Sequence, residues 1–264
     1  MLKLISFLIA SLVLGIIGCK QPTDSQNAGW GIKVIAHSSS TINVCWENRT
    51  EDDRRYKDLR AAFSNYARTQ FDRTNIRLVG WQDCQNPSSN NEIRITWTDS
   101  EENQNFWQDG KSIIGRGIGG ARPSPFWATL RPSKISSVTA APTLALNSKN
   151  YENLKVEVGN AKALNWFSGA HFLHELGHSV GLLHETAHPN NTTFCSTGER
   201  FKDHLKDWAD VDAEATLRDN IVATKKYDPK SIMNYCWINA FRSSGRLLEL
   251  SESDVFTINA LYPQ

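Results

Sequence analysis

Three histidines and one glutamate between residues 174 and 184 have the spacing of a catalytic metal site. The segment reads HELGHSVGLLH, so His174 and His178 are four residues apart. On a helix, side chains with this spacing leave the same face one turn apart, and both imidazoles can reach one Zn²⁺ ion. Glu175 would project beside the metal, outside its ligand shell, where it could take a proton from a water molecule. The expected chemistry is metal-assisted hydrolysis with Glu175 as the general base.

A turn after this helix would supply the third ligand. Gly181 lies where the helix must end, because glycine accepts a positive φ and lets the backbone reverse sharply. The turn would bring His184 back toward the other two histidines, and three protein ligands leave one position open, as in catalytic zinc sites. The alternative is a helix with merely packed histidines. It requires five specified positions to coincide by chance, with a probability of about one in ten thousand.

His171 precedes His174 by three residues and falls near the same predicted face. It could be a further ligand. Because the three-histidine set is already complete, we expect instead a packed histidine, or one that supports a ligand from behind.

The full pattern H-E-x-x-H-x-x-G-x-x-H resembles the signature of the metzincin zinc peptidases. Residues 231–235, SIMNY, resemble the Met-turn of that group in the Ser-x-Met-x-Tyr form found in astacins, and Glu185 directly after His184 is also astacin-like. The resemblance implies that Met233 forms an apolar floor under the histidines. It also implies that Tyr235 approaches the zinc, either as a fifth ligand or as a hydrogen-bond donor to the oxyanion of a tetrahedral intermediate.

Two features depart from the astacin pattern. Astacins usually have histidine where this chain has Asn234. Their zymogens also carry a propeptide whose aspartate blocks the zinc, whereas only a short segment separates Cys19 from the first predicted strand here. In astacins the glutamate after the third histidine binds the freed amino terminus of the mature enzyme. A lipid-modified Cys19 could not insert in that way, so we expect Glu185 to hold a local partner. The chain therefore resembles a minimal bacterial metzincin more than a true astacin.

Hydrophobic patterning predicts the elements that position these residues. Gly31–Trp46 is typical of a strand or hairpin, and an amphipathic helix is expected over about Asp53–Phe71. Further strands are predicted at Ile76–Trp81, Glu92–Thr98 and Phe126–Arg131. A loop is expected over Pro132–Asn150. Two more helices are predicted, a long one from about Ala161 and a short capped one within Leu250–Pro263.

This order predicts an α+β fold, with a mixed twisted sheet and a helix packed on it. The resemblance sharpens that prediction. It implies a metzincin-like N-terminal subdomain (30–184) with two long helices, a smaller and mostly irregular or helical C-terminal subdomain (185–264), and zinc in the cleft between them. Residues 115–120, GRGIGG, formally match a nucleotide-binding glycine pattern. They lack the strand-turn-helix context, so a loop is expected.

The N-terminus reads as an export signal. Residues 1–20, MLKLISFLIASLVLGIIGCK, contain one early lysine and an apolar run too short to span a bilayer. The ending IIGC resembles the bacterial lipobox, which implies cleavage after residue 18, acylation of Cys19 and a polar tether over 19–29. The residue after Cys19 is Lys20, which favours the outer membrane or cell surface. The alternative is an ordinary signal peptide and a secreted or periplasmic protein.

Four cysteines remain once Cys19 is set aside: Cys45, Cys84, Cys195 and Cys236. An even number in an exported chain favours disulfides, and no C-x-x-C spacing suggests a metal site. Three pairings are possible, of which we expect the two local ones, Cys45 with Cys84 and Cys195 with Cys236.

Composition limits the function classes. With 29 Lys and Arg against 28 Asp and Glu, the net charge is +1, which excludes nucleic-acid binding by bulk charge. The single long apolar run, at the N-terminus, excludes a polytopic membrane protein. The prediction is a monomeric, lipid-anchored zinc endopeptidase whose peptide substrate lies extended along an edge strand near residues 126–130. Four tryptophans could line its subsites or fill the core instead: Trp107, Trp127, Trp166 and Trp237.

Two competing functions remain open. One is a zinc-bearing adhesin or substrate-capture lipoprotein without turnover, although mere binding requires neither Glu175 nor Tyr235. The other is a metal hydrolase that acts on cell-wall peptide amides.

Overall fold

The computed structural model describes residues 30–32, 39–48, 51–85, 92–98, 111–112, 144–185, 221–223 and 226–264. Several predictions lie outside these residues: the signal peptide, Cys19 and its tether, the glycine-rich segment 115–120, the strand and substrate edge at 126–131, Trp107, Trp127 and Cys195. Within the described part of the chain, no helix combines the length and the apolar character needed to cross a membrane.

A five-stranded sheet forms the base of the fold, in the order β3-β2-β4-β6-β5. The strands are β2 (Thr41–Trp46), β3 (Arg77–Asp83), β4 (Glu92–Thr98), β5 (Lys111–Ser112) and β6 (Leu144–Asn147). All the pairings among β2, β3, β4 and β6 are parallel, whereas β5 runs antiparallel to β6. The fold is therefore α+β with a mixed sheet, as the sequence predicts.

The first described strand belongs to a separate sheet. β1 (Trp30–Ile32) pairs antiparallel with β7 (Ile221–Ala223), and β2 pairs with β3 and β4. The hairpin reading of residues 31–46 is therefore wrong. The extended pattern is right, but β1 finds its partner almost two hundred residues away, at Ile221–Ala223, and no local turn signal can indicate such a partner.

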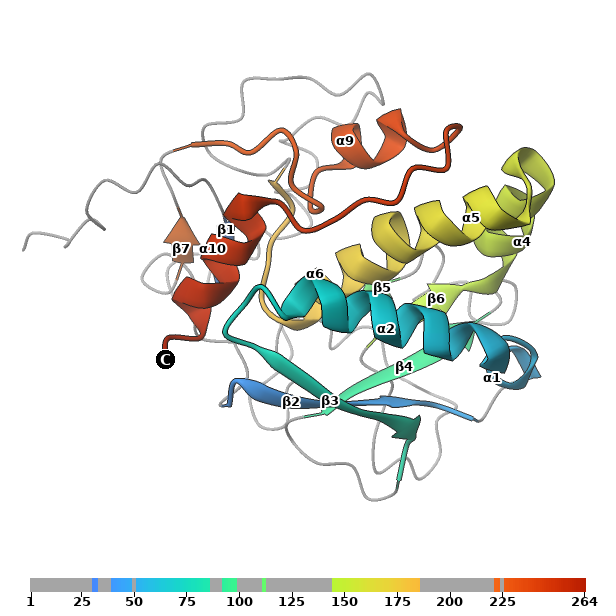
Figure 1. Ribbon diagram of the computed structural model, residues 1–264, viewed down its shortest axis with the longest axis horizontal. Helices are drawn as coiled ribbons and strands as arrows, with labels where there is room; N and C mark the ends of the chain where they lie inside the picture. Colours follow the sequence, from blue (N-terminus) through green and yellow to red (C-terminus); the bar gives the residue numbers. More distant parts are fainter. Residues whose placement is uncertain are drawn as a thin grey trace, which may run out of the picture.

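The helices lie together on one side of the sheet (Figure 1). They are α1 (Glu51–Arg55), the 3-10 turn η1 (Lys57–Leu59), α2 (Arg60–Phe71), α4 (Ser148–Val158), α5 (Asn160–Phe167), the π-helical turn η2 (Ser168–Leu173), α6 (His174–Ser179), α9 (Tyr235–Ala240) and α10 (Glu252–Leu261). The helix expected at 53–71 is present with a 3-10 turn inside it. The helix expected from about residue 161 is the continuous run α5-η2-α6.

The loop expected at 132–150 is wrong over its last seven residues. Residues 144–147 form β6, and α4 begins at Ser148. Every residue of β6 is buried, so both faces of the strand are covered and its sequence LALN shows no alternation. Asn147 ends the strand and caps α4, since its side chain accepts a hydrogen bond from Asn150 N.

Aromatic rings join the helices to the sheet. Trp46 and Trp97 on the sheet contact Phe63 of α2, Phe167 of α5 and Phe172 of η2, with ring centroids 5.6–6.3 Å apart in these contacts. Phe172 lies two residues before His174. The core therefore fixes the base of the helix that carries the first two predicted ligands.

Candidate metal centre

The structure brings the three predicted ligands together. His174 and His178 project from α6, and Nε2 of His184 lies 3.3 Å from Nε2 of His174 and 2.9 Å from Nε2 of His178. In a tetrahedral site with Zn–N distances of about 2.0–2.1 Å, two ligand nitrogens are about 3.3–3.4 Å apart. The first pair matches this separation, and the second is somewhat closer. The three imidazoles could bind one metal ion.

The hydrogen bonds of the other ring nitrogens favour metal binding. His174 Nδ1 lies 2.8 Å from Ile232 O, and His178 Nδ1 lies 2.8 Å from Leu182 O. A carbonyl oxygen only accepts, so each Nδ1 must carry the hydrogen and each Nε2 must present a lone pair. The Nε2 lone pairs of His174 and His178 then both face Nε2 of His184. A cation bound between the three nitrogens would pair with all of these lone pairs at once.

Burial keeps the two helical histidines neutral. His174 and His178 are almost fully buried, and the loss of solvation lowers the pKa of His174 to about 4 and that of His178 to about 3. The neighbouring His174 adds to the shift at His178, whereas the bond to Leu182 O opposes it. Both imidazoles are therefore unprotonated near pH 7, which is the state that a metal ligand requires.

The chain reverses where the sequence predicts it. α6 ends at Ser179, and Gly181 has a φ of +105°, in the region that favours glycine. The reversal is closed by Leu182 N, which donates to Gly177 O at 2.9 Å. As a result, the imidazole of His184 lies beside that of His178.

Met233 packs directly against the helix of the two ligands. It is 1% exposed, and a Cβ atom at position 177 would lie only 2.8 Å from its Sδ atom. Gly177 therefore permits this contact, because any side chain there would displace the methionine. Met233 therefore lies against the turn of α6 between His174 and His178.

Tyr235, the first residue of α9, also contacts the histidines. Its Oη lies 2.8 Å from Nε2 of His184, and its ring centroid is 4.7 Å from that of His184 and 5.2 Å from that of His174. Glu175 follows His174 on α6 and is 6% exposed. Thus the phenol and the three imidazoles meet at one place, and Glu175 belongs to the same turn of helix.

Glu185 has a local partner, as predicted. Its Oε1 accepts a hydrogen bond from Asp228 N at 2.7 Å, and its own backbone N donates to Met233 O. Burial raises the pKa of this carboxyl to about 8, although the bond from Asp228 N counteracts that rise. Glu185 thus ties the segment after His184 to the turn that contains Met233.

Asp254 supports the site, and sequence reasoning did not assign it this role. Its Oδ1 accepts from Ser231 Oγ at 2.6 Å and its Oδ2 from Ile232 N at 3.0 Å, while Ile232 O receives the hydrogen of His174 Nδ1. The sequence predicts a capped helix in this segment, and the cap is a capping box formed by Ser251 and Asp254. Nothing in the sequence pointed to its second contact, with the turn at 231–232.

Two side chains with alternative sequence-based interpretations pack against other side chains of the fold; Trp166 is buried and His171 is partly buried. His171 lies between aromatic rings, with centroid distances of 5.0 Å to Trp166 and 4.7 Å to Phe167, so the packed reading is confirmed. Trp166 is 2% exposed and donates from Nε1 to Ile238 O. Trp237 is partly buried and packs against Phe241.

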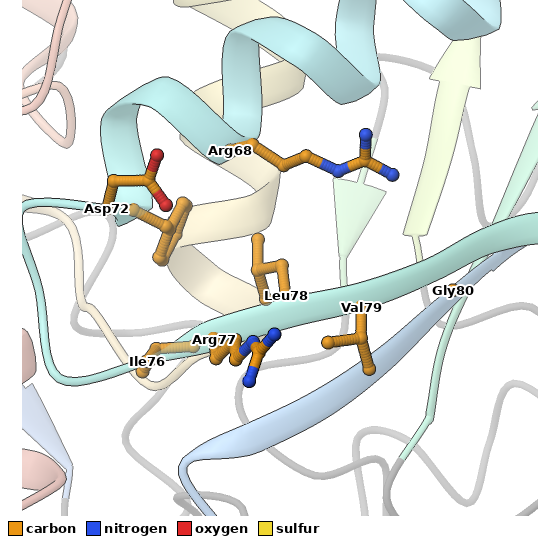
Figure 2. Close-up of a pocket in the computed structure, with 8 residues that line it drawn as sticks. Arg68, Asp72, Ile76, Arg77, Leu78, Val79 and Gly80 are labelled. Carbon is orange, nitrogen blue, oxygen red and sulfur yellow. The ribbon is translucent and has the colours of Figure 1, made fainter.

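A cavity of about 370 Å³ lies elsewhere, between α2 and β3. Figure 2 shows its lining, which comprises Arg68, Phe71, Asp72, Ile76, Arg77, Leu78, Val79 and Gly80. None of these residues belongs to the histidine site, so this cavity is separate from the candidate metal centre.

One of the two expected disulfides is present among the described residues, between Cys45 and Cys84. Cys236 is also disulfide-bonded. Its expected partner Cys195 lies outside the described residues, so the second pairing stays a prediction.

Comparison with known proteins finds similar solved structures but no matching family model. No family model matches the chain, and no curated protein matches it. A structure of myroilysin aligns over 89% of this chain and 99% of its own, with 18% identity and a TM-score of 0.48. A second, a crystal structure of myroilysin, aligns over 87% of this chain and 86% of its own, with 17% identity and a TM-score of 0.45.

Proposed function

We propose that this chain is a zinc-dependent endopeptidase. The observation that carries the proposal is the convergence of three imidazole nitrogens, two of them oriented by backbone carbonyls so that their lone pairs face the same point. The donor set consists of nitrogen alone and suits zinc, and three ligands leave room for a reacting group. When bound, the zinc would supply an acidified water and polarise a carbonyl.

The chain's own residues would carry the protons. Glu175 would take a proton from the attacking water and return it to the leaving amine, so it acts first as general base and then as general acid. Tyr235 would donate a hydrogen bond to the carbonyl oxygen as negative charge develops there, because its Oη lies 2.8 Å from Nε2 of the candidate ligand His184. Together they account for both proton transfers and for the oxyanion.

A peptide substrate would bind in extended form along an edge of the sheet, adding one strand to it. The described edge next to α6 is β5, which α6 contacts together with β6.

We also propose a lipid anchor at Cys19, a location at the outer membrane or cell surface, and a monomeric state.

The decisive experiment compares zinc content and cleavage in one preparation. The purified protein is expected to contain one zinc per chain and to cleave a peptide library, with products read by mass spectrometry. Glu175→Gln is expected to keep the zinc and to lower the cleavage rate by about 10²- to 10⁴-fold. The matched control is Glu252→Gln, an equivalent change at an exposed residue of α10, which should leave both unchanged.

Cleavage by Glu175→Gln at the wild-type rate would contradict the mechanism. Zinc binding without cleavage of any peptide would favour a capture protein. Release of fragments from purified peptidoglycan, with no peptide cleavage, would favour a cell-wall amide hydrolase.

A further inference from the structure

Asn234 stands where the astacin pattern usually has histidine, and in this structure both its backbone and its side-chain amide are hydrogen-bonded. It is 0% exposed. Its backbone N donates to Ser231 O and its backbone O accepts from Ile238 N, both at 3.0 Å. Its Oδ1 accepts from Cys236 N at 3.0 Å, and its Nδ2 donates to Tyr227 Oη at 2.6 Å.

Only a short amide side chain can make all of these bonds. Oδ1 caps the N-terminus of α9, which requires an acceptor close to the backbone. Nδ2 must donate to Tyr227 and, more weakly, toward Asp228 O at 3.4 Å. Aspartate would keep the cap but has no hydrogen to donate. A neutral histidine that accepts at Nδ1 carries its hydrogen at Nε2, farther from the backbone than the Nδ2 of asparagine. The residue that departs from the family pattern is therefore specified by its surroundings here.

The helix that Asn234 caps begins with Tyr235. α9 has six residues, too few to be stable without tertiary contacts. Its far end is held separately, because Trp166 Nε1 donates to Ile238 O at 3.1 Å. Loss of the cap would therefore loosen the first turn of α9, and with it Tyr235, while the last turn stays docked.

We propose that Asn234 is a positioning residue that holds the phenol of Tyr235 against His184. For its catalytic consequence the inference rests on the proposed peptidase function. Its structural part does not, since it concerns only the contact between Tyr235 Oη and His184 Nε2.

The first test is spectroscopic and uses metal-free protein. With ¹⁵N-labelled histidine, Tyr235→Phe defines the Nε2 resonance of His184 without its phenol partner. Asn234→Ala is expected to shift that resonance most of the way toward the Tyr235→Phe position, and Tyr227→Phe to shift it part of the way. Asn147→Ala is the matched control, because Asn147 is also a buried asparagine that caps a helix, α4, and it should leave the resonance in place.

An unchanged His184 resonance in Asn234→Ala would overturn the proposal. If that variant does not fold, Tyr227→Phe decides instead, because it removes one partner of Nδ2 and leaves Asn234 in place. An unchanged resonance in Tyr227→Phe would then overturn the proposal.

The second test is kinetic. Asn234→Ala is expected to lower kcat for peptide hydrolysis by about five- to tenfold, as loss of a helix cap would, with little change in zinc content. Added to Tyr235→Phe, it should cause no further loss, because the two changes remove the same contact. Losses that multiply would overturn the positioning role. If the wild type cleaves no peptide, the proposed function fails, while the resonance of His184 still decides the role of Asn234.

Discussion

His171 and His174 are three residues apart in sequence, but their side chains have different surroundings. His174 Nδ1 bonds to Ile232 O and its Nε2 faces His184, whereas His171 lies against the rings of Trp166 and Phe167. In a regular α-helix these residues would lie near one face. His171 instead belongs to the π-helical turn η2, whose wider turn rotates it away from the ligands.

The packing of His171 predicts an acid-sensitive fold. Burial lowers the pKa of His171 to about 3, so the unfolded chain binds a proton below its ordinary value of about 6.5 while the folded chain does not. The free energy of unfolding therefore falls as the pH falls through this window. His171→Phe should remove that contribution, so its advantage over wild type should grow by about 1.4 kcal/mol per pH unit below about 6.5.

Urea unfolding of metal-free protein at pH 8, 6 and 5 measures this difference. Because His171 contacts rings and is not a ligand, zinc content at pH 8 should be the same in both proteins. If the difference in free energy of unfolding between the two proteins did not depend on pH, His171 would have the same pKa in the folded and the unfolded chain, and the prediction would be wrong.

At the scale of elements, one helix start holds the turn that orients a ligand. Asp254 accepts from Ser251 N inside the capping box of α10, and it also accepts from Ser231 Oγ and Ile232 N. Ile232 O in turn fixes His174. The start of α10 and the first imidazole are therefore connected through a single residue, Ile232.

Asp254→Asn should weaken both folding and metal binding. An amide has one acceptor oxygen, so at least one N–H or O–H that now bonds to the carboxylate would lose its partner, at a cost of about 1–3 kcal/mol. Zinc affinity should fall as well, by about 10- to 100-fold, as it does when groups behind a ligand are lost. Competition with a chelator measures it. The neighbouring Glu252→Gln should change neither quantity by much, since its bond to Arg73 is exposed.

Some elements around the site could be predicted from the sequence, and others could not. The helical spacing of the histidines, the glycine turn and the capped terminal helix depend on neighbours within a few residues, and all three are present. β6 could not be predicted by alternation, because both its faces are buried. α4 carried a readable signal in Asn147, Tyr151 and Leu154, a cap followed by two buried residues three apart. The bonds of Asp254 and Asn234 to the Met233 turn were beyond prediction, because they depend on how distant segments dock.

At the scale of the whole molecule, one face of α2 holds the C-terminal segment. Tyr66 donates to Leu248 O, Gln70 Oε1 accepts from Leu250 N, and Arg73 donates to Leu250 O. These three residues are four and three apart, so they lie along one stripe of the helix and the turn after it. The aromatic core fixes α2 on the sheet, and α2 in turn fixes the chain that leads into α10.

The disulfide and the histidines lie near opposite edges of the five-stranded sheet. Cys45 is in β2 and Cys84 directly follows β3, at one edge of the sheet, whereas α6 contacts β5 and β6 at the opposite edge. The bond closes a loop between residues 39 apart in sequence. Chain entropy alone then gives it a contribution of about 4 kcal/mol to the free energy of unfolding.

The double variant Cys45→Ala, Cys84→Ala should therefore separate stability from site geometry. Its free energy of unfolding, from urea titration without reductant, should fall by about 3–4 kcal/mol. Its zinc affinity at a temperature where it stays folded should match wild type within about threefold, because sites far apart without shared partners act independently. A large loss of affinity in the folded variant would mean that the β2–β3 edge and the histidines are coupled through the sheet. The aromatic core, and not the C-terminal segment held by α2, would then be what fixes the ligand geometry.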